Sequence, residues 1–209
     1  MKWMKIGAYC GVFLLIFGVL LIFLGLYYSL NDLQDNVDDE TFFSFRTIQV
    51  FSLTLTIFIW FLSILFYYGF TKLGKFAKSK FLYNCAYLVY TIALIVFVIW
   101  LFVFYNNYFG VWTEAFSGPG LFLIFIFPIF FIAKLSFSIS LIYMEKKIKG
   151  SRVTGIVGLV LMLSFVIISF LNFDVLSFLS TDDYMHLLIG IPYIFETIVL
   201  FKASKKFEK

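Results

Sequence analysis

Six long apolar runs follow one another in this chain of 209 residues, and they constrain its fold more than any other feature. Each run is close to the roughly 20 residues that an α-helix needs to cross a bilayer. The runs are continuous, without the alternation of apolar and polar residues that marks barrel strands. We therefore predict an all-α polytopic membrane protein, a single domain (1–209) built as a bundle of six transmembrane helices. The expected spans are residues 6–30, 47–70, 82–105, 120–144, 154–179 and 185–201.

The composition excludes most soluble alternatives. Hydrophobic residues make up 63% of the chain and charged residues 13%, whereas soluble domains are about a quarter charged. That leaves too little polar surface to coat a water-soluble globule. The net charge of +4 resides in short basic clusters beside the apolar runs, which is a topology signal. We therefore expect the lipid bilayer as a partner, and no nucleic acid.

The charges of the connecting segments alternate along the chain. Both termini and the second and fourth connections are basic, while the first, third and fifth are acidic or weakly charged. The basic connections contain Lys72, Lys75, Lys78, Lys80, Lys146, Lys147, Lys149 and Arg152. The positive-inside rule places such segments in the cytoplasm. We expect a multi-pass protein of the cell membrane with both termini in the cytoplasm, which agrees with an even number of spans.

Two opposite charges lie inside predicted spans. Lys134 precedes Met144 by ten residues, and Glu196 precedes Lys202 by six, which places them about 15 Å and 9 Å from the basic boundary. A central lysine costs about 2.5–3.5 kcal/mol to insert, so it normally has a partner or a water path. One interpretation is an ion pair that fixes packing, or two side chains that reach separately for the interface. The other is a polar site for a substrate, proton or ion.

Further polar residues are candidates for the same site. Ser138 lies one turn after Lys134, and the two share a helix face. Gln49 and Thr56 belong to a stripe in the second span, spaced by three and four residues. The whole stripe is Gln49, Ser52, Thr56, Trp60, Ser63 and Tyr67. Such a stripe normally faces other helices, either as interhelical hydrogen bonding or as the wall of a cavity.

Glycine and proline add to this pattern. The first span carries Gly7, Gly11, Gly18 and Gly25 at spacings of four and seven, so we expect this face to pack inward against a neighbour. Pro128 and Pro192 interrupt the hydrogen bonding of the two charged spans. Kinks and freed carbonyls beside buried charge occur where transporters bind solute, although prolines are also frequent in ordinary membrane helices.

Motifs for metals, cofactors and catalysis are lacking. The acidic first connection has neither the glycine nor the terminal glutamate of a calcium loop. The single histidine, His186, with Asp182 and Asp183 is interpreted as a solvated loop end. Cys10 and Cys85 are interpreted as small buried hydrophobic residues. The chain contains no HExxH, GxSxG or P-loop. We expect no cofactor, no metal and no enzymatic activity.

Several stretches resemble an uncharacterised family of archaeal and bacterial multi-span membrane proteins. They are residues 5–18 (KIGAYCGVFLLIFG), 134–152, 154–163 (TGIVGLVLML) and 191–204 (IPYIFETIVLFKAS). The similarity is one of pattern over scattered parts of the chain. It implies a multi-span fold and no particular activity.

Together these features predict a small transport or permease-like component that recognises a solute or ion through Glu196 and Lys134. The alternative is a non-transporting accessory, assembly or immunity-type membrane subunit whose polar faces pack against a partner subunit or a second copy of the chain.

Overall fold

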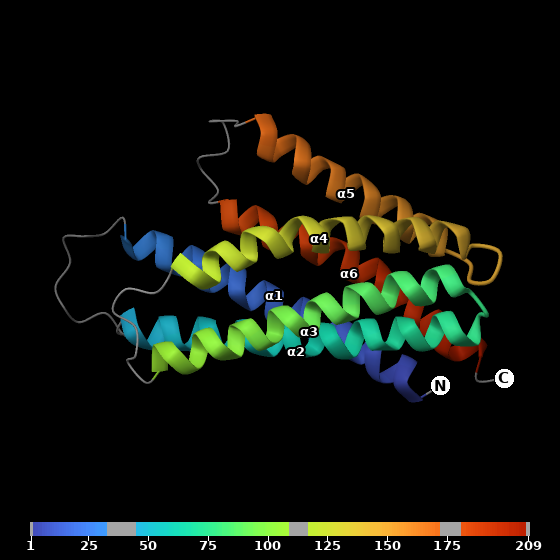
Figure 1. The fold of residues 1–209 in the computed structure, drawn as a ribbon, viewed down its shortest axis with the longest axis horizontal. Coiled ribbons are helices and arrows are strands. Elements are labelled where there is room, and N and C mark those ends of the chain that lie inside the picture. The colour runs from blue at the N-terminus through green and yellow to red at the C-terminus, as the bar shows by residue number, and fades with distance from the viewer. Residues whose placement is uncertain (1, 33–44, 109–116, 172–180, 208–209) are drawn as a thin grey trace.

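The computed structural model describes residues 2–32, 45–108, 117–171 and 181–207, and it describes side chains at 2–21, 23–24, 50–102, 126, 128–164 and 191–207. Over these residues the chain forms six α-helices (Figure 1). They are α1 (Lys2–Asp32), α2 (Phe45–Phe76), α3 (Lys80–Tyr108), α4 (Ser117–Tyr143), α5 (Ser151–Leu171) and α6 (Thr181–Lys206). Each predicted span overlaps one of these helices, so the prediction of an all-α fold is confirmed.

The helices extend beyond the apolar runs at their basic ends. α2 continues to Phe76 rather than residue 70, and α6 continues to Lys206 rather than residue 201. Lysine and leucine are good helix formers, and hydrogen bonding along a helix does not stop where lipid would end. The predicted fifth span continued to residue 179, and its part from residue 172 onward lies outside the described residues.

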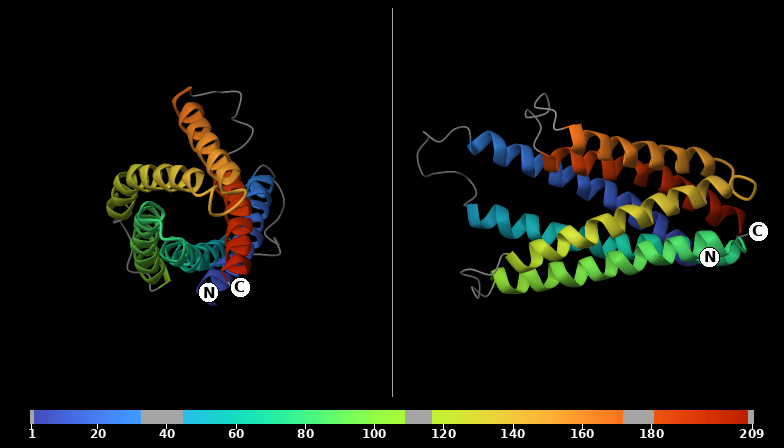
Figure 2. Two further views of the ribbon diagram at one scale, coloured as in Figure 1. Left: turned by 90° about the vertical axis from the view of Figure 1, so that its right-hand side faces the viewer. Right: turned by 45° about the horizontal axis from the view of Figure 1, so that its top comes forward.

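The helices are arranged in a ring. Each helix packs against the next along the chain, α6 packs against α1, and α2 also touches α6. The end-on view in Figure 2 shows this order around the bundle. Over the described residues α4 and α6 are not packed side by side, because α5 lies between them. The ring surrounds large buried side chains, among them Phe66, Phe70, Phe137, Leu141 and Leu200.

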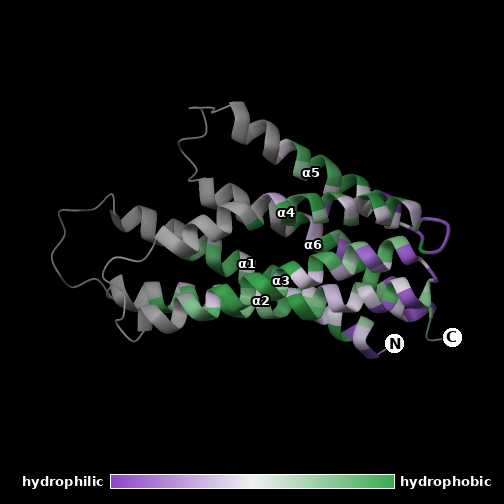
Figure 3. Ribbon diagram, viewed as in Figure 1, coloured by the Kyte–Doolittle hydropathy of each residue, from purple (hydrophilic) through white to green (hydrophobic). Residues whose placement is uncertain are grey.

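Both chain ends lie at the same end of the bundle as the turns at residues 77–79 and 144–150 (Figure 1). We call this the basic end. Figure 3 shows that hydrophilic residues gather there, while the middle of the bundle is hydrophobic. The short turn at residues 77–79 joins α2 to α3, and the loop at residues 144–150 joins α4 to α5. Each of these helix pairs is therefore antiparallel.

Three helices are long and apolar enough to cross a membrane. Within the described residues they are 2–21 of α1, 50–76 of α2 and 80–102 of α3. The described apolar parts of α4 and α5, residues 128–143 and 151–164, are shorter. Membrane association is therefore supported by length and composition.

Glycine allows α1 and α2 to approach closely. A Cβ atom on Gly7 would lie 3.1 Å from the Cα of Gly69 and 3.2 Å from the carbonyl oxygen of Phe66. Gly11 is also buried, as expected of an inward-facing stripe. The prediction is wrong for Gly18, where a Cβ would meet no atom within 4 Å. Gly25 lies outside the described side chains.

Candidate functional site

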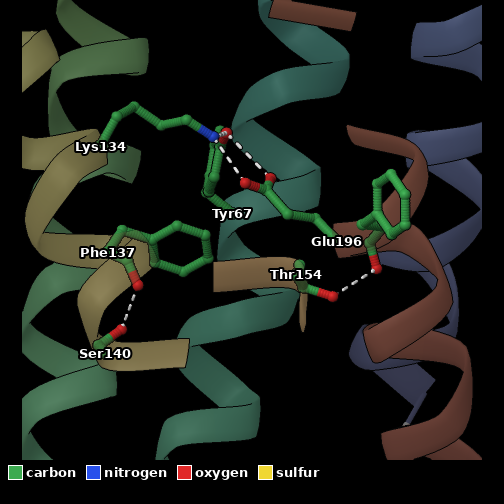
Figure 4. A network of polar contacts seen from close by, with 7 residues as sticks. Tyr67, Lys134, Phe137, Ser140, Thr154 and Glu196 are labelled. Atoms are coloured by element: carbon green, nitrogen blue, oxygen red, sulfur yellow. Dashed lines mark hydrogen bonds and ion pairs between the residues drawn. The ribbon is translucent and has the colours of Figure 1, made fainter. Parts of the chain in front are cut away.

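The two charges predicted inside the spans form an ion pair. Lys134 Nζ lies 2.9 Å from Glu196 Oε1, and Figure 4 shows the two side chains meeting between α4 and α6. Lys134 is 2% exposed and Glu196 is 1% exposed. Because α4 and α6 are not packed together, the contact depends on the reach of the long lysine side chain. The ion pair thus lies inside the ring and links two helices that do not otherwise adjoin.

Tyr67 of α2 completes the polar contacts. Its hydroxyl accepts a hydrogen bond of 2.5 Å from Lys134 Nζ and donates one of 3.4 Å to Glu196 Oε2. The Tyr67 side chain is fully buried. Three alternate members of the ring, α2, α4 and α6, therefore meet in one closed group of polar atoms, which we call the Lys–Glu–Tyr triad.

Aromatic rings enclose the lysine ammonium. Lys134 Nζ lies 4.9 Å from the ring centroid of Tyr67, 5.2 Å from that of Tyr193 and 5.4 Å from that of Phe137. The distances to Tyr193 and Phe137 are within the 6 Å at which a cation is attracted to an aromatic face, whereas the ammonium meets Tyr67 at the hydroxyl edge of its ring. Tyr193 lies on α6, one turn before Glu196, and Phe137 lies on α4, one turn after Lys134. We call these three rings and the Glu196 carboxylate the ammonium cage.

The cage explains how the charges are tolerated in an apolar bundle. An ammonium has three N–H donors, and two of them are directed at Glu196 and Tyr67. Isolated charge at such a position would cost several kcal/mol, whereas a paired and hydrogen-bonded charge costs much less. The arrangement can hold one positive and one negative charge together, away from solvent. It also makes each charge dependent on the other.

Ser138 does not join the triad. It is buried at the contact between α4 and α5, where a Cβ on Gly158 would lie 2.5 Å from Ser138 Oγ. A Cβ on Gly155 would lie 2.4 Å from the Ser138 carbonyl oxygen. Ser140, considered with it, donates a 2.6 Å hydrogen bond to the carbonyl of Phe137 within its own helix. These serines are part of helix packing around the pair.

Thr56 and Gln49 are also separate from the triad. Thr56 precedes Tyr67 by eleven residues on α2, about 16 Å along the helix axis. Its hydroxyl donates a 2.9 Å hydrogen bond to the carbonyl of Ser52, so it is satisfied within its own helix. Gln49 lies still further along α2, and its side chain is outside the described residues.

Three residues of the site were not among the predicted site residues. Tyr67 was visible as the last member of the polar stripe in the second span. Its place beside Lys134 could not be seen without knowing which helices adjoin. Tyr193 and Phe137 carry no signal of their own in a chain with 13 tyrosines and 31 phenylalanines. Their spacing of three from Glu196 and Lys134 puts them on the same faces as the charges.

A second group of polar contacts lies at the basic end. The carboxylate of Glu145 accepts hydrogen bonds from the backbone N–H groups of Gly150, at 3.0 Å, and Arg152, at 2.7 Å. The Gly150 and Arg152 hydrogen bonds lower the pKa of Glu145 from its ordinary value. Because α5 begins at Ser151, the carboxylate caps the amino-terminal end of that helix.

Lysine side chains join the turns of the basic end. Lys147 donates a hydrogen bond to the carbonyl of Ala77 in the turn between α2 and α3. Lys206, near the end of α6, donates a 2.6 Å hydrogen bond to the carbonyl of Lys147. Among the described side chains no group of three His, Cys, Asp or Glu residues lies close enough to hold a metal ion.

Comparison of the chain with protein-family models, curated proteins and solved structures finds no match. The resemblance to a family of multi-span membrane proteins therefore stays a prediction.

Proposed function

We propose that this chain is a six-span protein of the cell membrane with both termini in the cytoplasm. We further propose that it is a small transport or permease-like component whose polar site is the Lys–Glu–Tyr triad. The protein would move or recognise a solute or ion and would not transform it.

The proposed topology is supported by charge and geometry together. The basic turns and both chain ends share one end of the bundle, as the positive-inside rule requires of cytoplasmic segments. Three helices meet the length and hydropathy needed for a span, and the remaining three are antiparallel partners in the same ring. An even number of crossings follows from two termini on one side.

The buried ion pair carries the functional proposal. Packing of helices in lipid requires small residues and close contact, and it does not require charge. Ionisable residues inside membrane spans are costly, and they commonly mark substrate, ion or proton pathways. Here such residues come from three helices that meet in the middle of a ring. In this conformation the pair is closed to solvent, so transport requires a second conformation that opens it.

The completeness of the triad favours a second candidate function. Lys134, Glu196 and Tyr67 are hydrogen-bonded to one another, as a purely structural pair would also need to be. On this alternative the chain is an accessory, assembly or immunity-type subunit with a permanently dry interior. Its exposed apolar faces would contact lipid, a partner subunit or a second copy of the chain.

Thiol accessibility separates the two candidates without knowledge of the cargo. In a background with Cys10→Ser and Cys85→Ser, Ser63→Cys places a thiol one turn from Tyr67 on the same face of α2. Ser138→Cys is the matched control, since Ser63 and Ser138 are 2% and 1% exposed, and Ser138 is held between α4 and α5. A membrane-impermeant cationic thiol reagent is applied to right-side-out and inside-out vesicles. Transport predicts reaction at Ser63→Cys only; no reaction from either side supports the accessory function.

The same cysteine-free background tests the topology. Asn36→Cys and Asp183→Cys fall in segments proposed to be extracytoplasmic, and Lys75→Cys falls at the basic end. An impermeant thiol reagent added to intact cells should label the first two positions and not the third. Labelling of Lys75→Cys alone would overturn the proposed orientation.

A further inference from the structure

The ammonium cage has the composition of a site for an organic cation. One carboxylate, one phenolic hydroxyl and three aromatic rings surround Lys134 Nζ. Proteins recognise choline and methylated lysine with the same elements, because aromatic faces attract a diffuse positive charge and a carboxylate neutralises it. The cage comes from α2, α4 and α6, so its parts are held independently of the lysine that fills it.

The chemistry of the cage discriminates between classes of ligand. An anion would meet the Glu196 carboxylate and the electron-rich rings of Tyr193 and Phe137. Hard metal cations prefer six or more oxygen ligands, whereas the described oxygens hydrogen-bonded to the ammonium are Glu196 Oε1 and the Tyr67 hydroxyl. An alkylammonium needs only one or two acceptors and gains from the rings. The site therefore suits a small primary or methylated alkylammonium.

Lys134 fills this site with a tethered group of the same kind. Its ammonium is carried on a four-carbon stem from α4, which does not pack against α6. A lysine side chain can move its head several ångströms towards the interface by changing rotamers. Such a movement towards the basic end would leave Glu196, Tyr67 and Tyr193 in place and would vacate the volume of an alkylammonium.

We propose that the ammonium cage binds a small alkylammonium cation, with Lys134 occupying the cage when the cation is absent. This inference rests on the proposed transport function for its physiological meaning, and it names the cargo class. The cation takes the place of the lysine ammonium beside Glu196, and the lysine ammonium moves several ångströms towards the basic end.

Chemical rescue of Lys134→Ala tests the cage directly. The substitution removes the stem and the ammonium but leaves the carboxylate and the Tyr67 and Tyr193 rings. We expect n-propylammonium chloride to raise the unfolding midpoint of the purified variant in a saturable manner. Its half-saturating concentration should be at least about tenfold below that of potassium chloride, as cation–π attraction in a desolvated site implies. Neutral n-propanol is the isosteric control, and Lys134→Ala/Glu196→Gln should lose the response.

A measurement on the wild-type protein covers the case in which Lys134→Ala does not fold. Trimethylammonium keeps one N–H for Glu196 and cannot itself be reductively methylated to a stable product. If it displaces Lys134, the reductive methylation of Lys134 by formaldehyde and cyanoborohydride should rise severalfold relative to equal potassium chloride, as read by mass spectrometry. Rescue by propanol as strong as by propylammonium, or unchanged methylation of Lys134, overturns the proposal.

Uptake separates this inference from the proposed function. Wild-type proteoliposomes are tested for saturable uptake of labelled methylammonium, with Glu196→Gln as the inactive control. If propylammonium rescues Lys134→Ala but methylammonium is not taken up, the cage binds alkylammonium and the transport function is wrong. If Ser63→Cys is accessible to solvent from both sides but propylammonium does not rescue Lys134→Ala, the transport function stands and the proposed cargo class is wrong.

Discussion

Lys134 and Glu196 touch through their side chains, with Nζ and Oε1 2.9 Å apart, although the helices that carry them are separated by α5. The contact therefore joins two helices that are not neighbours in the ring, and Tyr67 adds a third helix to it. Loss of one charge leaves the other buried without a counterion, and this dependence leads to the first prediction.

The double substitution should destabilise the protein much less than either single substitution. We expect Glu196→Gln or Lys134→Met alone to lower the free energy of unfolding by about 3–5 kcal/mol, because an unpaired buried charge remains. The double variant should recover most of that loss, since no charge is left to bury. Denaturant unfolding in a mild detergent measures all three. Equal stability of the four proteins would show that the pair is not coupled.

Removal of the Tyr67 hydroxyl should weaken the triad without leaving a cavity where the ring stood. Tyr67→Phe keeps the ring against Lys134 and loses hydrogen bonds to two charged groups, so we expect a loss of about 1.5–3 kcal/mol in unfolding free energy. Tyr68→Phe is the adjacent control, because its ring contacts with Trp3 and Tyr90 are retained, and it should change stability by less than about 0.5 kcal/mol. Similar losses in both variants would contradict a specific role for Tyr67.

The close approach of α1 and α2 predicts opposite effects for two glycines of one helix. In Gly7→Ala the new methyl meets backbone atoms of α2 at 3.1–3.2 Å, so the helices must separate, at a cost of about 1–3 kcal/mol. In Gly18→Ala the methyl enters open space and favours the helix by up to about 1 kcal/mol. Thermal unfolding of both variants in the same detergent gives the comparison. A stabilised Gly7→Ala protein would be incompatible with this packing.

The cap at Glu145 predicts a pH-dependent difference between two proteins. Its pKa is lowered in the folded state by hydrogen bonds from Gly150 and Arg152. The resulting stabilisation is fully present above the unfolded value of about 4.3 and disappears as the pH falls through the lower folded value. Glu145→Gln should therefore unfold at a lower temperature than wild type near pH 7, and the gap should close on acidification below pH 4. A gap that is constant with pH would exclude the ionised cap as its cause.

The sequence alone determined the elements and their approximate limits. Length and continuous hydrophobicity are sufficient for this, because every backbone polar group in an apolar environment must be satisfied within a helix. The same rule made charges inside the runs conspicuous, so Lys134 and Glu196 could be chosen as a possible pair from depth and sign. The helix limits were less well predicted at the basic end, where lysines continue a helix as readily as they begin a turn.

Only the tertiary structure decided which side chains meet. The apolar residues of a membrane helix cover its whole circumference, because lipid and bundle interior are equally apolar, so hydrophobicity does not mark the inward face. For that reason the sequence could not show that Ser138 faces α5 or that Tyr67, Tyr193 and Phe137 enclose the lysine. The ring order also places α5 between α4 and α6, which makes the buried pair a contact of long side chains rather than of neighbouring helices.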